Sequence, residues 1–168
     1  MNDENPFIFL GLAVPSLSAS QNIRLLIELF PGVAPATTTS VLERVHSKEN
    51  SLLGSSINKI VPGVLCELYL SGTSLVNDET IPKNNKHIKG SVSVCRRGPL
   101  ASQIAPSLMI CFATLPSLDG HHLVIGHVVE GMESLMKLER YGSLPLGECT
   151  HCPVVTTCGQ IVDDEEGP

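Results

Sequence analysis

Two pairs of residues in this 168-residue chain have the types and spacing for metal binding or proton transfer. Cys149 and Cys152 are separated by two residues, as in half of a zinc site, and His121 and His122 are adjacent. A structural zinc site needs four ligands, but the sequence contains no second Cys-x-x-Cys or His-x-x-x-His pair. The sequence also identifies no carboxylate or cysteine partner for the two histidines. We therefore expect no metal ion and no cofactor, with a redox or metal module at Cys149 and Cys152 as an alternative.

The charged residues argue against a nucleic-acid partner. The one basic cluster, at residues 83–89, includes His87 and is interrupted by asparagines, which is typical of a solvated loop. The formal net charge is -6 and includes an acidic run at residues 163–166. Binding to nucleic acid depends on Lys and Arg that neutralise phosphates, and the chain has no block of such residues.

The composition is that of a compact globular domain, with 42% hydrophobic and 17% charged residues. The apolar run at residues 6–14 could be the core of a signal peptide, but its flank, residues 2–5, is acidic where a secretory flank is basic. No stretch reaches the roughly 18 apolar residues that a membrane span requires. We expect an intracellular protein, in the cytoplasm or the nucleus, without a membrane partner.

The elements that must position any site are mostly short strands. Two helices are expected, at residues 33–46, where Pro35 fits a first turn, and at residues 132–141. The remaining apolar segments are bounded by Gly, Pro or Asn and predict strands at residues 6–14, 22–30, 56–61, 64–70, 90–94, 108–113, 123–127 and 154–162. Many short strands favour a sandwich or a barrel.

Four strings of residues occur in an order that one protein family shares. Residues 28–38 read E-L-F-P-G-V-A-P-A-T-T, and residues 60–63 read I-V-P-G, followed by Cys66. Residues 118–132 contain L-D-G-H-H, V-I-G and V-E-G-M, and residues 157–160 read T-C-G-Q. These strings resemble the cyclophilin patterns E-L-F/Y-x-x-x-x-P-x-T, I-I-P-G-F-M-x-Q, L-D-G-K-H-V-V-F-G-x-V-x-x-G-M and D-C-G-Q.

The resemblance spans residues 6–162 and implies a fold. That fold is mainly β: an eight-stranded antiparallel cyclophilin-like β-barrel capped by two α-helices. We expect one cyclophilin-like domain at residues 1–162 and an acidic C-terminal tail at residues 163–168.

The resemblance also implies an activity, the cis-trans isomerisation of X-Pro peptide bonds. In the family an Arg reaches toward the prolyl nitrogen, Phe and Met side chains hold the ring, a Trp borders it, and Gln and Asn hold the peptide. The Arg position is Lys59 here, which keeps the charge but lacks the planar fork of guanidinium N–H donors. The next positions become Val64, Leu65 and Glu67 in place of Phe, Met and Gln.

The second half of the implied pocket is also changed. Ser107 takes the place of a peptide-holding Gln, Met109 that of a Phe, and Ser117 that of the Trp, whereas Leu118 and His122 match the family. The family's Ala-Asn pair becomes Cys95 and Arg96, and two extra residues leave the register open between Gly98 and Leu108.

These replacements favour a binding module over an efficient enzyme. We expect the ligand to be a protein partner or a proline-containing peptide. The chain is expected to act in isolation or as a subunit of a larger assembly, and to have weak or no isomerase activity. The alternative is an active peptidyl-prolyl isomerase in which Lys59 supplies the positive charge. Because the Trp position is lost at Ser117, we expect poor binding of cyclosporin-type cyclic peptides.

Overall fold

The computed structural model forms one β-barrel and describes residues 5–14, 22–48, 51–71, 75–76, 79–94 and 106–162. Its strands are β1 (Phe7–Ala13), β2 (Ile23–Leu29), β3 (Ser56–Val61), β4 (Leu65–Tyr69), β5 (Ser91–Val94), β6 (Ser107–Cys111), β7 (Leu123–Glu130) and β8 (Val154–Ile161). The predicted acidic tail, residues 163–168, and the Cys95 and Arg96 positions lie outside the described residues.

The strands close into a barrel in the order β1-β2-β7-β5-β6-β4-β3-β8, and β8 pairs with β1. The paired strands are antiparallel. This arrangement, with two α-helices, confirms the fold predicted from the sequence. A closed barrel has no unpaired sheet edge to which another strand could bind. Side chains of the strands can therefore meet a ligand only on the outer face of the barrel.

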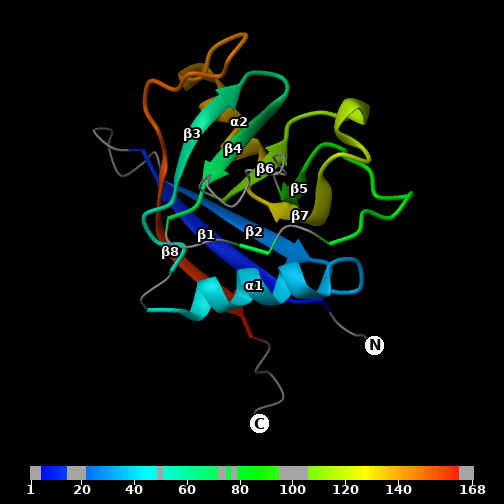
Figure 1. Ribbon diagram of the computed structural model, residues 1–168. Helices are drawn as coiled ribbons and strands as arrows, with labels where there is room; N and C mark the ends of the chain where they lie inside the picture. The colour runs from blue at the N-terminus through cyan, green and yellow to red at the C-terminus, as the bar shows by residue number, and fades with distance from the viewer. Residues whose placement is uncertain are drawn as a thin grey trace.

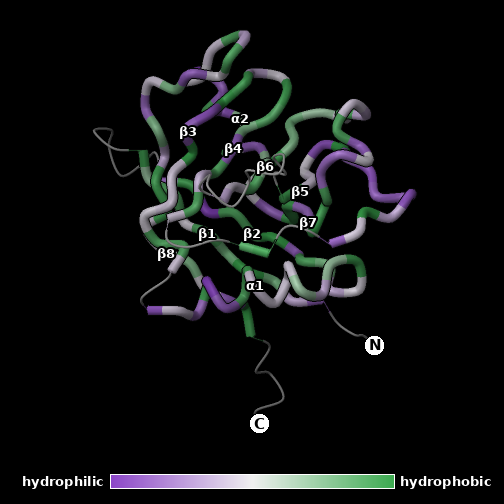
Figure 2. The backbone as a smooth tube through the Cα atoms, in the orientation of Figure 1, coloured by the Kyte–Doolittle hydropathy of each residue, from purple (hydrophilic) through white to green (hydrophobic). Residues whose placement is uncertain are grey.

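Side chains alternate between the barrel interior and the outside. In β1 and β2 every second residue is buried, and apolar and polar stretches follow one another along the backbone (Figure 2). The interior is filled by aliphatic side chains, the largest fully buried ones being Ile8, Leu10, Leu12, Leu25, Ile27, Leu29, Ile57, Ile60, Leu68, Leu123 and Ile125 from the strands and Leu52 from the turn before β3.

The first helix, α1 (Pro35–His46), lies across one end of the barrel and contacts β8 (Figure 1). Pro35 occupies its first turn, as predicted, since proline lacks only an N–H that has no helical partner there. The Glu79 carboxylate accepts hydrogen bonds from the amides of Ala36 and Thr37 at 3.0 and 2.7 Å. A residue far along the chain therefore caps the helix.

The second predicted helix, residues 132–141, is divided in two. It begins as α2 (Met132–Met136) and continues as a 3-10 helix, η4 (Lys137–Tyr141), before Gly142. Short 3-10 turns are common where an α-helix ends. β7 is longer than predicted, because its pairing with β2 continues to Glu130. Among the described residues, no helix combines the length and the apolar character needed to cross a membrane.

Candidate functional site

A row of side chains crosses four neighbouring strands on the outside of the barrel. Lys59 of β3 pairs with Glu67 of β4, Glu67 with Met109 of β6, and Met109 with Ser93 of β5. Directly opposite residues of antiparallel strands project to the same face, and these strands follow one another in Figure 1. The cross-strand row, Lys59, Glu67, Met109 and Ser93, thus brings three of the predicted site residues together.

A small apolar cluster lies beside this row and apart from the main core. Leu65 and Met109 are buried, and Val64, Leu115 and Leu118 pack against them. Four of these five residues were expected in the pocket. Leu115 was not, because it precedes the motif that contains Leu118. We call Val64, Leu65, Met109, Leu115 and Leu118 the outer apolar cluster.

Glu67 brings a carboxylate to the middle of the row. Its side chain is only 3% exposed, and the Ser107 hydroxyl donates a hydrogen bond of 2.5 Å to its Oε2. A buried carboxylate is stable only with such hydrogen bonds or with nearby positive charge. The half-buried Lys59 is its partner on β3.

Gly147 makes room for Lys59. Its φ is +81°, and a Cβ at this position would approach the Lys59 Cγ to 2.8 Å. The segment is joined to β3 by the Ile60 amide, which donates to the Gly147 carbonyl oxygen at 2.8 Å. A side chain at Gly147 would therefore displace either this segment or Lys59.

The turn after β6 forms one wall of the cluster. The 3-10 helix η3 (Pro116–Leu118) carries Leu118 against Leu65 and Met109. The predicted residues Ser117 and His122 flank this wall: Ser117 is exposed on η3 and His122 is half-buried just before β7.

His87 is buried next to η3, and the sequence did not predict a role for it in the site. Its side chain is 0% exposed, so the prediction of a solvated loop at residues 83–89 is wrong for this residue, although the lysines there are exposed. Its Nδ1 lies 2.9 Å from Asp119 Oδ1, and its Nε2 lies 2.9 Å from the Ser93 hydroxyl. Because Asp119 is 32 residues away along the chain, no local sequence pattern predicts that the two side chains pair.

The hydrogen bond from His87 also favours the ionised form of Asp119. The side-chain hydrogen bond with His87 is the largest cause holding the pKa of Asp119 below its ordinary value of 3.8, and the His87 amide adds to the effect. A carboxylate that accepts two such bonds stays ionised at neutral pH.

The Cys149 thiol has an environment unlike that of a reactive cysteine. Burial is the largest cause that raises the pKa of Cys149 to about 12, with further contributions from Cys152. Thiol reactivity depends on the thiolate, so this environment disfavours a redox role for Cys149. Within the described ranges, no group of three or more His, Cys, Asp and Glu is arranged to hold a metal ion.

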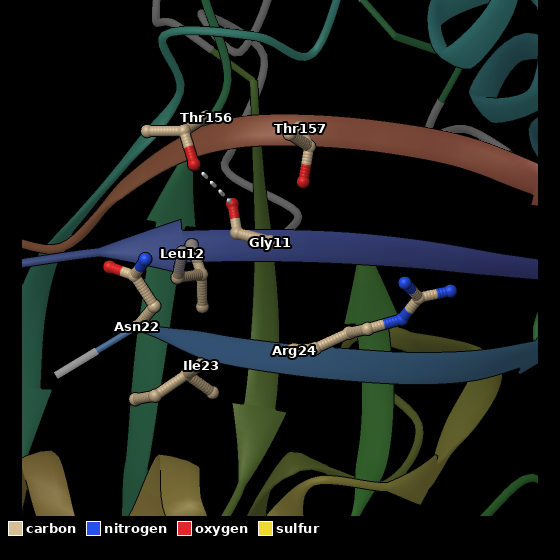
Figure 3. Close-up of a pocket in the computed structure, with 7 residues that line it drawn as sticks. All are labelled: Gly11, Leu12, Asn22, Ile23, Arg24, Thr156 and Thr157. Atoms are coloured by element: carbon tan, nitrogen blue, oxygen red, sulfur yellow. Dashed lines mark hydrogen bonds between the residues drawn. The ribbon is translucent and has the colours of Figure 1, made fainter. Parts of the chain in front are cut away.

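A hollow of about 250 Å³ lies on a different part of the barrel, over β1, β2 and β8. Figure 3 shows its lining residues and the bond from the Thr156 hydroxyl to the Gly11 carbonyl oxygen. The strand order places β1 and β2 away from β4 and β6. The hollow is therefore separate from the cross-strand row.

One comparison with known protein families bears on this site. The family model described as cyclophilin type peptidyl-prolyl cis-trans isomerase/CLD matches residues 16–159. The matched range contains the cross-strand row, the outer apolar cluster and the wall.

Proposed function

The chain belongs to the cyclophilin-type peptidyl-prolyl cis-trans isomerase family, and we propose that it acts mainly as a module that binds a proline-containing segment of a protein partner. In this proposal its isomerase activity is weak or absent. The observation that carries the proposal is the outer apolar cluster, which lies beside the charged Lys59 and Glu67.

The apolar cluster supports binding. Its five aliphatic and thioether side chains provide an apolar seat for a proline ring, while polar groups beside it can fix the peptide. None of the five is aromatic, so the ring would be held by smaller and more flexible side chains. Such a seat can bind a proline segment without stabilising its twisted state.

The charges support weak catalysis. Isomerisation crosses a barrier of about 18–20 kcal/mol, and an enzyme must bind the twisted amide more tightly than either planar form. In the family, a positive group near the prolyl nitrogen provides this preference. Here the Glu67 carboxylate is the cross-strand partner of Lys59 and offsets its field.

A protease-free isomerisation assay on a short X-Pro peptide tests the proposal, with peptide affinity measured in parallel by fluorescence anisotropy. We expect saturable binding and a rate close to the uncatalysed one. Lys59→Ala should change that rate little, and Lys48→Ala, at an exposed lysine beyond α1, serves as the matched control. Fast turnover that Lys59→Ala abolishes would establish the alternative, an active isomerase that uses Lys59.

The partner is proposed to be a protein, with the chain acting alone or as a subunit of an assembly. Capture of the partner should depend on the outer apolar cluster. Met109→Ala and Leu65→Ala should each weaken capture, and the exposed Leu53→Ala should leave it unchanged. Cyclosporin-type cyclic peptides should bind poorly in a calorimetric titration, and tight binding would contradict the assignment of Ser117 to the family's Trp position.

A further inference from the structure

The wall of the outer apolar cluster has little support of its own. It is a single 3-10 turn, η3, in which no residue is buried. Its internal bonds are local: the Leu118 amide donates to the Leu115 carbonyl oxygen and the Asp119 amide to that of Pro116, both at 3.1 Å. A turn of this length is not stable alone, so its position depends on contacts with other segments.

Three hydrogen bonds join this wall to His87. The Leu115 amide donates to the His87 carbonyl oxygen at 3.0 Å. The His87 amide donates to Asp119 Oδ1 at 2.8 Å, and the ring Nδ1 lies 2.9 Å from the same oxygen. Leu115 and Asp119 are the residues on either side of η3, so His87 holds the wall at both of its ends.

His87 is in turn fixed to the barrel. Its Nε2 lies 2.9 Å from the hydroxyl of Ser93, which belongs to the cross-strand row and donates to the Leu123 carbonyl oxygen at 3.1 Å. The neighbouring Asn85 side chain exchanges two hydrogen bonds with the backbone of Val124, at 2.8 and 3.0 Å. The imidazole therefore connects β5 and β7 to the wall.

We propose that His87 is a positioning residue for ligand binding: by bridging Ser93 and Asp119, it keeps Leu115 and Leu118 packed against Leu65 and Met109. This inference rests on the proposed function, because the wall matters to a ligand only if the outer apolar cluster receives one. His87 itself is buried and touches no ligand in this role. It acts through the position of Leu118.

Paired substitutions of Asp119, whose side chain is 18% exposed, test the inference, and circular dichroism checks that each variant is folded. Asp119→Ala removes both acceptor bonds, whereas Asp119→Asn retains an oxygen that can accept them. We expect Asp119→Ala to weaken binding of a labelled X-Pro peptide by about ten-fold, as for the loss of two modest hydrogen bonds, and Asp119→Asn to restore most of the affinity. Equal affinity for Asp119→Ala and the unmodified chain would overturn the inference.

Amide hydrogen exchange provides a readout that needs no ligand. In His87→Ala the amides of Leu115, Leu118 and Asp119 should lose protection by about ten-fold or more, while amides in β1 and β2 keep theirs. Added imidazole, which fits the vacated site, should restore protection to the wall. Uniform loss of protection, or none, would contradict a positioning role.

His127→Ala is the matched control. His127 also bonds a carboxylate, with Nε2 3.0 Å from Glu28 Oε1, but it lies on β7 away from the wall. Its removal should change neither the peptide affinity nor the exchange at Leu115. If the unmodified chain binds no X-Pro peptide, the proposed function fails, whereas the exchange experiment still decides whether His87 holds the wall.

Discussion

The opposite charges of Lys59 and Glu67 lie on neighbouring strands at the centre of the cross-strand row. Antiparallel partners have Cβ atoms roughly 4.5–5.5 Å apart, and a carboxylate at that range reduces the potential that an ammonium group creates at a bound peptide. The Ser107 hydroxyl holds the carboxylate in this place. The positive potential that Lys59 creates is thus reduced by the carboxylate of its cross-strand neighbour.

Glu67→Gln should therefore raise isomerase activity. The amide has the same shape, its oxygen can still accept from Ser107, and the charge that opposes Lys59 is removed. We expect a several-fold higher rate constant in NMR exchange measurements on an X-Pro peptide, and a larger gain when Lys59→Arg is added. Glu43→Gln, at an exposed position on α1, is the control. An unchanged rate in the double variant would mean that the absence of aromatic side chains from the outer apolar cluster, and not the charges, limits catalysis.

Because of Asp119, the free energy of unfolding should depend on pH in the acidic range. Its pKa in the folded chain is lowered below 3.8, chiefly by the hydrogen bond with His87, so the folded state binds its proton less readily than the unfolded state does. The stabilisation is fully present above the unfolded pKa and is lost as the pH falls through the folded pKa. Denaturant unfolding at several pH values should give a stability difference between the unmodified chain and Asp119→Asn that is constant near neutrality and shrinks below about pH 4. A difference that stays constant down to pH 2 would be incompatible with this linkage.

At the scale of elements, α1 depends on a cap from outside its own segment. Its N-cap residue, Ala34, has no side chain that can accept a hydrogen bond, and Glu79 supplies both oxygens instead. A carboxylate at this end also interacts favourably with the helix dipole. The loop that contains Glu79 and the helix therefore stabilise each other.

Glu79→Ala should lower the free energy of unfolding by about 0.5–2 kcal/mol, the usual effect of removing a helix cap. Exchange at the amides of Ala36 and Thr37 should rise at the same time. Glu43→Ala, which removes an exposed carboxylate from α1 itself, should have a much smaller effect. Equal effects of the two substitutions would assign the loss to overall charge and not to the cap.

The elements themselves were largely predictable from the sequence. Short apolar runs bounded by Gly, Pro or Asn identify strands, and Pro35 identifies a helix start, because these preferences act over a few residues. The division of residues 132–141 into α2 and η4 was not predictable, since the apolar residues there keep the spacing of a single helix throughout.

The site residues were predicted from the resemblance to cyclophilins, and strand alternation explains why some of them come together. Leu65, Glu67 and Met109 share a face because their spacing on β4 and the pairing of β4 with β6 require it. The pairing of His87 with Asp119 depends instead on how two loops meet after the barrel closes. A histidine within a lysine-rich stretch carries no local sign that it will be buried.

At the scale of the whole molecule, closure of the barrel leaves an apolar projection on its outside, in the loop before β8. Leu144 and Leu146 are 67% and 68% exposed and flank Pro145, which is also exposed. Two backbone hydrogen bonds close the base of this loop: the Gly147 amide donates to the Ser143 carbonyl oxygen at 2.9 Å, and the Ser143 amide to that of Ile60 at 3.2 Å. Backbone bonds, and not the leucines, hold the loop on β3.

Replacing both leucines by serine should thus change the surface without changing the fold. We expect the midpoint of thermal unfolding to move by less than about 2 °C, while hydrophobic-dye fluorescence falls and solubility at high concentration rises, because contiguous exposed apolar area promotes association. Leu53→Ser, at a single leucine that is 48% exposed, should affect both properties less. A large fall in the unfolding midpoint would instead mean that Leu144 or Leu146 packs against the barrel, and the loop would then belong to the core and not to the surface.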